Sequence, residues 1–374
     1  MAGSERGTIV LGAGGSGGHI FPAQAVAQEL VRRGFDIVLI TDDRGKSFSG
    51  RFVDTRIEII HAATFAGRNP LKLVAALFRI LGGIGQAFGL LDRFKAKAAV
   101  GFGGYSSLPT MVAARLRGVP SCLHDPNAVL GRVNRLLAGH VDIIGAAFEN
   151  MQGVKSRHKD KIRMIGNPLR DEVITAREVA YAPPGKDGPI TLLVFGGSQG
   201  AAALAEVVPA AIALLPEALK IRLHVSQQAR VDAAEEVQRD YDDMGVRADV
   251  APFFTNLPER MAGAHLVIAR AGASTVTELG AIGRPSILVP LPTAMDDHQS
   301  VNAEALTDPG GAWLMPQSEL TAERLADKLR SLLCDGNELA RAAEAAKGTG
   351  RPNATSDFAD LIEELIASKA KRGH

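Results

Sequence analysis

Cysteine is scarce in this sequence, and neither charge is in excess. Cys122 and Cys334 stand far apart and outside any metal-ligand spacing, which excludes a disulfide framework and a cysteine-based metal site and indicates a reducing compartment. Lysine and arginine together number 42 against 41 acidic residues, which excludes the strongly basic surface that is typical of nucleic-acid-binding proteins. We therefore expect a cytoplasmic chain without a nucleic-acid partner.

The sequence also lacks an uninterrupted hydrophobic run. The apolar segment 8–11 follows Met1 too closely for a signal peptide to fit before it, so we expect none. The longest apolar stretch, residues 71–91, is nearly long enough to span a bilayer. Lys72, Arg79 and Gln86 interrupt it, and its glycines weaken a helix. We therefore predict that this stretch does not span a membrane.

Short apolar runs alternate with segments of helical period along the whole chain. The runs that we predict as strands are 8–11, 36–40, 98–100, 121–123 and 141–144 in the first half, and 191–195, 222–225, 266–269 and 286–289 in the second. Strands that alternate with helices form parallel sheets covered on both faces. The sequence therefore predicts an α/β fold.

The two halves of the chain repeat the same order of features. A strand, a loop of small residues and a helix follow one another in two pairs of segments: 8–30 with 190–215, and 100–120 with 268–285. Repetition on this scale indicates two copies of one fold. We predict two Rossmann-like domains that face each other across a cleft, residues 1–170 and 171–351. The final helix, about 352–374, is able to pack back on the first domain.

The first glycine-rich loop, residues 12–18, follows a strand and opens a helix, which is an arrangement that suits a phosphate ligand. Gly12, Gly14 and Gly17 match the dinucleotide pattern G-x-G-x-x-G, and Asp42 and Asp43 stand where a ribose would be held. An NAD-dependent dehydrogenase is therefore a competing interpretation. Three further loops of the same kind favour another diphosphate ligand, because one dinucleotide does not need four.

Two of these loops lie in the second half, at 196–200 and 270–275. The latter leads into a helix whose N-terminus suits a diphosphate, with Glu278 placed to hold two ribose hydroxyls. Thr275 and Glu278 also fit a capping box, and spacing alone favours that structural role. Further on, Gln299 and Asn302 are three residues apart and share a helix face that suits sugar hydroxyls. Ordinary surface polarity is the alternative for these two amides.

Several motifs, in this order, make the chain resemble glycosyltransferase family 28, which has the GT-B fold, along nearly its full length. The motifs are GGSGGH at 14–19 with Phe21 and Pro22, GFGGY at 101–105, HDPN at 124–127, GNP at 166–168 with Arg170, GGSQG at 196–200, RAGASTVTE at 270–278, and His298 and Gln299 with Asn302. The resemblance implies an inverting transferase that moves GlcNAc from UDP-GlcNAc to the MurNAc C4 hydroxyl of undecaprenyl-diphospho-MurNAc-pentapeptide, a step of peptidoglycan synthesis. It also implies a peripheral protein on the cytoplasmic face of the bacterial inner membrane. Its partners would be that anionic membrane surface and proteins of cell-wall synthesis or cell division.

The resemblance further implies a role for individual residues. The implied donor-binding residues are Ser16, Gly17, Gly18, Asn127, Arg170, Ser198, Gln199, Phe254, Ala273, Ser274, Thr275, Val276, Thr277, Glu278, Gln299 and Asn302. The implied acceptor-binding residues are Gly14, Gly15, Tyr105 and His124. The family often has Glu-Gln where this chain has Asp125 and Pro126, and often has glutamine in place of His298. We therefore leave the roles of Asp125 and His298 open.

His19 is the residue that we expect to act as the catalytic base. It stands at the mouth of the first loop, and its ordinary pKa lies near physiological pH. An equally weighted alternative is that it orients the loop or hydrogen-bonds the acceptor diphosphate. We expect no metal and no cofactor, because a helix N-terminus can support the departing UDP without one. Two other functions stay open: a UDP-GlcNAc 2-epimerase, and a non-catalytic nucleotide-sugar-binding scaffold in a cell-wall complex.

A lipid-linked acceptor would give the apolar stretch 71–91 a function as a membrane-binding surface. On a helical wheel its apolar residues cover an arc wider than the roughly 100° that a one-sided core helix needs. Two adjacent apolar stripes result, and the stripe that contains Leu77 and Ile80 is expected to face lipid while the other faces the core. Ala76 and Gly83 fall on the remaining, more polar side. A helix buried on both sides by its own protein is the alternative.

Overall fold

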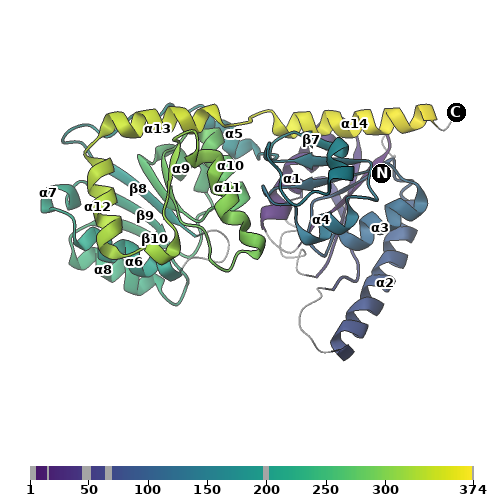
Figure 1. Ribbon diagram of the computed structural model, residues 1–374, viewed down its shortest axis with the longest axis horizontal. Helices are drawn as coiled ribbons and strands as arrows, with labels where there is room; N and C mark the ends of the chain where they lie inside the picture. The colour runs from purple at the N-terminus through teal and green to yellow at the C-terminus, as the bar shows by residue number, and fades with distance from the viewer. Residues whose placement is uncertain (1–5, 15–16, 44–51, 64–69, 197–201, 373–374) are drawn as a thin grey trace. The chain divides into compact units, whose positions relative to one another are not determined.

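The computed structural model describes residues 6–14, 17–43, 52–63, 70–196 and 202–372 (Figure 1). The chain divides into two compact units. The first contains Met1–Arg170 together with Asn353–His374, and the second contains Asp171–Pro352. Each unit has a sheet of its own, so each is described by itself.

The first unit contains a seven-stranded parallel sheet in the order β3-β2-β1-β4-β5-β6-β7. Its strands are β1 (Thr8–Gly12), β2 (Asp36–Thr41), β3 (Thr55–Ile59), β4 (Ala98–Gly101), β5 (Ser121–Asp125), β6 (Ile143–Ala146) and β7 (Ile162–Met164). Its helices are α1 (Gly17–Arg32), α2 (Pro70–Arg93), α3 (Leu108–Arg117), α4 (Arg132–Leu137), the 3₁₀ helix η2 (Ser156–Lys161) and α14 (Ala354–Arg372).

Helices cover both faces of this sheet. Successive residues of a strand point to opposite faces, so one strand contributes to two cores. Ile9 and Leu11 of β1 belong to a core with residues of α1 and α14. Val10, between them, belongs to a second core with residues of α2, α3 and α4. A strand buried on both faces therefore reads as a continuous apolar run, which is what made β1 visible in the sequence.

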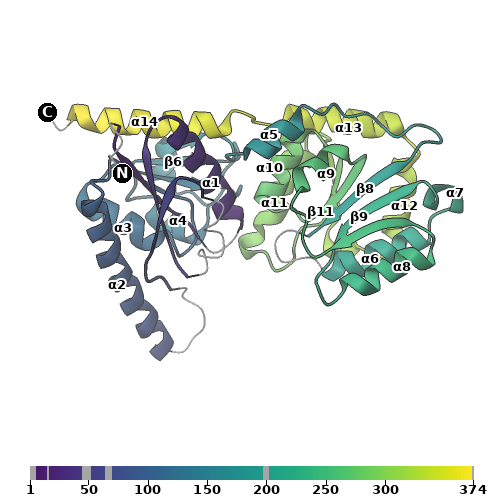
Figure 2. The ribbon, with the colours of Figure 1, turned by 180° about the vertical axis from the view of Figure 1, so that it is seen from behind.

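The last helix, α14, lies beside α1 in the first unit (Figures 1 and 2). Phe358 and Ile362 are fully buried in the core beneath it. Arg33, which directly follows α1, adds ion pairs with Asp360 at 2.5 Å and Glu363 at 3.1 Å. Each partly exposed ion pair of this kind contributes little to folding stability. The apolar contacts are therefore the main interaction that holds this helix in place.

The second unit contains a six-stranded parallel sheet in the order β10-β9-β8-β11-β12-β13. Its strands are β8 (Ile190–Phe195), β9 (Leu223–Gln228), β10 (Arg247–Ala251), β11 (Leu266–Ala269), β12 (Ser286–Leu288) and β13 (Ala312–Leu314). Its helices are α5 (Asp171–Arg177), α6 (Ala202–Ala213), α7 (Glu217–Lys220), α8 (Ala234–Asp243), α9 (Leu257–Gly263), α10 (Ala273–Ile282), η3 (Met295–Asp297), α11 (His298–Thr307), η4 (Gln317–Glu319), α12 (Ala322–Leu333) and α13 (Gly336–Gly348).

The second sheet repeats the strand order of the first. In both, the third, second and first strands along the chain precede the fourth, fifth and sixth, and the first unit adds β7 at the end. This is the order of a Rossmann-like sheet, whose ligands bind at the carboxyl ends of the strands beside the point where the order reverses. The reversal lies between β1 and β4 in the first unit and between β8 and β11 in the second.

Candidate active site

The N-terminus of α10 follows β11 at the reversal point of the second sheet. Gly272 is the N-cap residue, with φ −63° and ψ 147°, and no side chain caps the helix. The N–H groups of Ala273, Ser274 and Thr275 therefore have no acceptor within the helix, and the helix dipole adds a partial positive charge there. Backbone donors of this kind suit a diphosphate.

Val276 and Thr277 are the next two residues of this helix. Val276 is 2% exposed, and the Thr277 hydroxyl donates to the Ala273 carbonyl oxygen at 2.9 Å. The Val276 side chain is therefore buried away from a donor, and the Thr277 hydroxyl donates its proton within the helix.

Glu278 lies in the second turn of α10 and is 6% exposed. A capping box would require Thr275 at the N-cap and Glu278 in the first turn. Because the N-cap is Gly272, the capping-box interpretation of Glu278 is wrong. A buried carboxylate in this position is compatible with the ribose contact that the resemblance implies.

Gln299 and Asn302 lie three residues apart on α11, as the spacing predicted. Gln299 Oε1 accepts a hydrogen bond from the Leu291 amide at 2.9 Å. Asn302 is fully buried, and its Nδ2 donates to the Ala271 carbonyl oxygen at 3.3 Å. Both side chains therefore tie α11 to the loops that follow β11 and β12.

The turn that precedes α11 has an unusual backbone. Asp296 and Asp297 have φ values of 55° and 49°, in the left-handed region that non-glycine residues seldom adopt. Such strain is found preferentially at functional sites. Here it stands directly before His298, which hydrogen-bonds the Met295 carbonyl oxygen through Nδ1 at 2.8 Å.

Arg270 links the ends of three neighbouring strands. It is 6% exposed, and its Nη1 donates to the carbonyl oxygens of Val289 and Pro290 at 3.1 and 3.0 Å. Its Nη2 donates to Gln317 Oε1 at 2.5 Å, and burial lowers its pKa. The sequence motif contained Arg270 without a role and did not contain Gln317, because nothing in a single sequence connects positions so far apart.

Phe254 follows β10 and is buried. The guanidinium of Arg260 lies 4.1 Å from the centre of its ring. Arg260 also donates to Ser226 Oγ at 2.7 Å and pairs with Asp249 at 2.5 Å. These contacts fix the backbone at Phe254. Ser198 and Gln199, two further predicted donor-binding residues, lie outside the described residues.

In the first unit, His19 lies in the first turn of α1, next to the turn after β4. Gly103 and Gly104 have φ values of 85° and 71°, and a Cβ on Gly103 would stand 3.0 Å from His19 Cε1. Both the backbone conformation and the approach of the imidazole therefore require glycine at 103. The structure thus brings the GFGGY motif and the predicted base together. Tyr105, which follows, is half-buried.

The remaining residues of the first loop are described in part. Gly14 is buried, and a Cβ there would meet Ser106 Oγ at 2.7 Å. Gly17 and Gly18 begin α1, Gly17 buried and Gly18 half-buried. Gly15 and Ser16 lie outside the described residues.

His124 has no exposed surface. Its ring packs between Phe102 and Phe358, with centroid distances of 5.8 and 5.4 Å, and its Nε2 lies 3.3 Å from the Gly166 carbonyl oxygen. Burial lowers its pKa to about 4, which keeps the imidazole neutral at physiological pH. In this structure the side chain is therefore part of the core and is not exposed to an acceptor.

Asp125, whose role the sequence left open, ends β5 and is 2% exposed. Its carboxylate accepts hydrogen bonds from the loop that carries Asn127. Arg170 is half-buried, and its guanidinium lies 4.5 Å from the centre of the Phe21 ring. Asn127, Arg170 and His19 thus all belong to loops or helix ends that follow strands of the first sheet.

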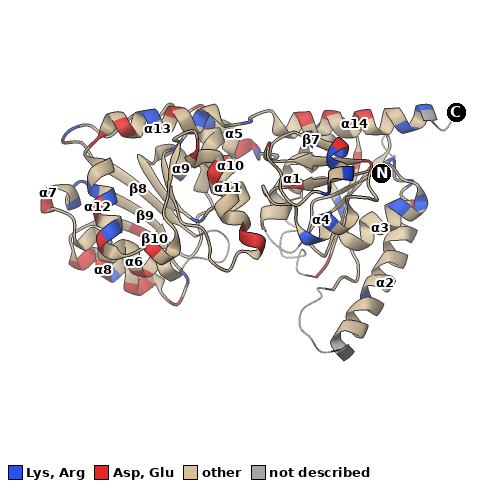
Figure 3. Ribbon diagram, viewed as in Figure 1, with Lys and Arg blue, Asp and Glu red and all other residues tan. Residues whose placement is uncertain are grey.

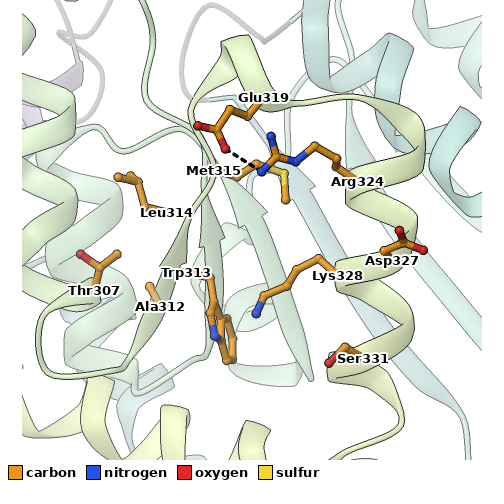
Figure 4. Close-up of a pocket in the computed structure, with 10 residues that line it drawn as sticks. All are labelled: Thr307, Ala312, Trp313, Leu314, Met315, Glu319, Arg324, Asp327, Lys328 and Ser331. Atoms are coloured by element: carbon orange, nitrogen blue, oxygen red, sulfur yellow. Dashed lines mark ion pairs between the residues drawn. The ribbon is translucent and has the colours of Figure 1, made fainter.

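Among the described residues, no three histidine, cysteine or acidic side chains gather to hold a metal ion. A cavity of about 670 Å³ is lined by α11, β13, η4 and α12 (Figure 4). Arg324 and Glu319 pair at 2.9 Å in its lining, and Lys328 Nζ lies 4.8 Å from the centre of the Trp313 ring. The lining contains none of the predicted substrate residues, so we assign the candidate site to the loops.

Comparison with known proteins places both halves of the chain in one family. Residues 9–146 match the glycosyltransferase family 28 N-terminal domain, and residues 191–365 match the glycosyltransferase family 28 C-terminal domain. A Paramagnetospirillum magneticum relative is 47% identical over 367 residues, which cover 98% of this chain and 99% of the relative. A Brucella suis relative is 46% identical over 368 residues, with 98% and 96% covered. Both relatives are named UDP-N-acetylglucosamine–N-acetylmuramyl-(pentapeptide) pyrophosphoryl-undecaprenol N-acetylglucosamine transferase.

Solved structures agree with this placement. The crystal structure of MurG from Acinetobacter baumannii matches with a TM-score of 0.78 at 31% identity, over 96% of this chain and 99% of that chain. A Listeria monocytogenes protein described as a UDP-N-acetylglucosamine 2-epimerase matches with a TM-score of 0.66 at 14% identity, over 96% and 97% of the two chains. The second likeness shows the fold alone. With two parallel α/β sheets and these matches, the predicted GT-B fold is confirmed, and the chain belongs to glycosyltransferase family 28.

Proposed function

We propose that this protein transfers GlcNAc from UDP-GlcNAc to the MurNAc C4 hydroxyl of undecaprenyl-diphospho-MurNAc-pentapeptide, with inversion at the anomeric carbon. The observation that carries the proposal is 47% identity, over 98% of the chain, to a relative named for this transfer. The loops described above supply the matching chemistry: open backbone donors at α10 and a buried acid in its second turn.

The donor is proposed to bind the second domain. The amides of Ala273, Ser274 and Thr275 hold its diphosphate, and Glu278 holds the ribose hydroxyls. As the anomeric C–O bond breaks, the electron pair leaves with UDP, and negative charge builds on the diphosphate. A helix N-terminus already pointing at that charge stabilises the transition state more than the ground state.

The acceptor hydroxyl must lose its proton as the new C–O bond forms. The position of His19 supports a role as the base, because its half-buried imidazole lies at the carboxyl edge of the first sheet. A contact with the acceptor diphosphate is the other role that this position allows. His19→Ala is expected to lower kcat by roughly 10²–10⁴-fold if the imidazole is the base, whereas a change confined to the acceptor KM would assign it to binding.

We further propose that the protein binds the cytoplasmic face of the inner membrane through α2. Residues Leu73–Arg93 are long and apolar enough to cross a bilayer, but Ile80 and Leu91 are buried in the core of the first domain. The helix is therefore suited to lie against a membrane rather than to span it. Proteins of cell-wall synthesis or division are proposed as partners at that surface.

The outer side of α2 is strongly apolar. Leu73, Val74, Leu77, Phe78 and Leu81 are exposed, with Phe78 69% exposed. The part of the helix that carries them extends beyond the sheet (Figures 1 and 2). An apolar patch of this kind on a soluble domain marks a binding surface.

Basic residues lie at the other end of the same helix. In Figure 3 most of α2 is uncharged, and basic residues gather at its C-terminal end. Arg93, Lys95 and Lys97 are exposed there. Anionic headgroups attract such residues by about 1 kcal/mol each near the surface, which supports an anionic membrane as the partner.

The test of the proposed reaction is transfer of labelled GlcNAc from UDP-GlcNAc to a synthetic polyprenyl-diphospho-MurNAc-pentapeptide. The proposal requires UDP release that depends on the acceptor and a labelled disaccharide product. Conversion of UDP-GlcNAc to its 2-epimer without any acceptor would instead identify an epimerase, and binding without turnover would identify a scaffold.

A further inference from the structure

Asp125 is the centre of a hydrogen-bonded turn between β5 and α4. Its Oδ1 accepts from the Asn127 amide at 3.0 Å and from Asn127 Nδ2 at 3.5 Å. Its Oδ2 accepts from the Gly131 amide at 2.7 Å and from Asn134 Nδ2 at 3.0 Å. One carboxylate therefore holds both ends of the loop, as well as the Asn127 side chain.

A buried carboxylate is a costly way to close a turn. Burial raises the pKa of Asp125, while the hydrogen bonds from Gly131, Asn127 and Asn134, and the nearby His19, lower it. An asparagine has one acceptor oxygen, so it could not accept from both the Asn127 and the Gly131 amides as the two carboxylate oxygens do. The groups that the carboxylate holds in place therefore explain an acid at position 125 better than a contribution to folding stability does.

Asn134 connects this turn to the glycine turn beside His19. It is 2% exposed, and its Nδ2 also donates to the His124 carbonyl oxygen at 3.1 Å. The position that a Cβ of Gly103 would occupy is 3.4 Å from Asn134 Nδ2 and 3.0 Å from His19 Cε1. Asn134 and the imidazole therefore lie against the same glycine, one on the α4 side and the other on the α1 side.

We propose that Asp125 and Asn134 are a pair of positioning residues, which fix the Asn127 side chain and the glycine turn beside His19 in the arrangement that transfer requires. The proposal rests on the proposed function, in which Asn127 contacts the donor sugar and His19 the acceptor. Neither member of the pair needs to touch a substrate. Each acts through a neighbour whose misplacement by about 1 Å can cost about 10²-fold in rate.

The experiment measures steady-state transfer by the full-length protein carrying Asp125→Asn, Asn134→Ala or Asn127→Ala, and by the double variant Asp125→Asn/Asn127→Ala. We expect kcat to fall by about 10²-fold in Asp125→Asn, with the Kd for UDP unchanged. Because Asp125 acts in part through Asn127, the loss in the double variant should be smaller than the product of the two single losses. Asp142→Asn is the matched control, since Asp142 caps the Ser121 amide at 2.9 Å at the opposite end of β5.

A second measurement does not depend on activity. In full-length Asp125→Ala, hydrogen exchange of the Asn127 and Gly131 amides should become faster than in the wild type. If Asp125→Ala does not fold, Asp125→Asn provides the same test, because its single acceptor oxygen cannot hold the backbone donors that now bond to two different carboxylate oxygens.

The outcomes separate the two proposals. Faster exchange with unchanged kcat, or a double variant whose losses multiply, would overturn the pair while leaving the reaction intact. Absence of transfer by the wild type would overturn the proposed function itself, and the exchange measurement would still report whether Asp125 holds the loop.

Discussion

Glu278 is the side chain on which the proposed donor site most depends. Its side chain is buried in the second turn of α10, six residues after the N-cap Gly272, so a role in capping does not explain it. If it holds two ribose hydroxyls, Glu278→Gln removes the charge from both hydrogen bonds. Each charge-assisted hydrogen bond contributes about 1.5–3 kcal/mol, so we expect the donor KM to rise by at least about tenfold.

Steady-state kinetics with varied UDP-GlcNAc measures this effect. Glu344→Gln is the matched control, because it makes the same chemical change at an exposed position of α13. An unchanged donor KM, accompanied by a lower melting temperature, would assign Glu278 to stability alone.

His124 gives a prediction for stability against pH. Its pKa is lowered from 6.5 to about 4 in the folded chain, chiefly by burial. As pH falls from about 6.5 to 4, the unfolded chain binds a proton that the folded chain excludes, so stability is lost over that window. The full difference corresponds to about 3 kcal/mol.

Urea unfolding of the wild type and of His124→Gln at about pH 7, 5.5 and 4.5 measures this contribution. The variant has no titrating ring, so its free energy of unfolding should fall less steeply toward low pH. Parallel curves for the two proteins would show that His124 titrates normally and is not as enclosed as its contacts indicate.

Residue by residue, sequence reasoning found the glycines and the motif side chains but not the residues that hold them. Gly103 and Gly104 were visible because a close approach of the backbone leaves only glycine as a choice. Asn134 and Gln317 were not, because an amide side chain is ordinary in a helix or turn until the fold brings a partner to it. His124 was visible within its motif, but its burial depends on Phe358, which is more than two hundred residues away in the chain.

At the level of elements, the strands that the sequence missed are the four outer ones, β3, β7, β10 and β13. Inner strands are buried on both faces and read as continuous apolar runs. Outer strands are partly exposed, as β10 is along Arg247–Ala251, and therefore lack that signal. Boundaries of the inner strands agreed to within a few residues.

Helix α2 was recognised as amphipathic, but its inner face was assigned wrongly. The sequence placed Ala76 and Gly83 on the more polar side and Ile80 toward lipid. In the structure Ala76 and Ile80 are 8% and 5% exposed, and Gly83 is packed against the His61 carbonyl oxygen. Small residues let the helix approach the domain closely, which leaves the larger apolar side chains outside.

This correction changes the variant that tests membrane binding. A glutamate at Ile80 would enter the core, so we choose Leu77→Glu/Phe78→Glu, at two exposed positions. Sedimentation with anionic vesicles should show weaker binding by the variant, and added salt should weaken binding of the wild type.

The control is Leu214→Glu/Ile221→Glu, which places the same charges at exposed positions of the second domain. Turnover on a short-chain, water-soluble acceptor should be preserved in both variants. If Leu77→Glu/Phe78→Glu binds vesicles as strongly as the wild type does, the membrane contact is not made by α2.

At the level of the whole molecule, the two domains share one topology but differ at the start of one equivalent helix. The helix after the fourth strand is α3 in the first unit and α10 in the second. The first turn of α3 contains Pro109, which has no N–H, and Thr110, which is fully buried. The same turn of α10 has three N–H groups without an acceptor within the helix, and Ser274 and Thr275 are half-buried. Of these two equivalent helices, α10 is therefore better suited to bind a diphosphate.

This asymmetry predicts where UDP binds in the intact protein. With saturating UDP, hydrogen exchange should slow in segment 271–278 and around Phe254, because the ligand protects the N-terminus of α10 and the backbone after β10. Segment 104–111, which contains the start of α3, should exchange as it does in the free protein. NADH is the control ligand, and it should protect neither segment, since the first glycine-rich loop is not proposed to hold a dinucleotide. Protection of 104–111 by UDP would place the nucleotide in the first domain and reverse the assignment of the two domains.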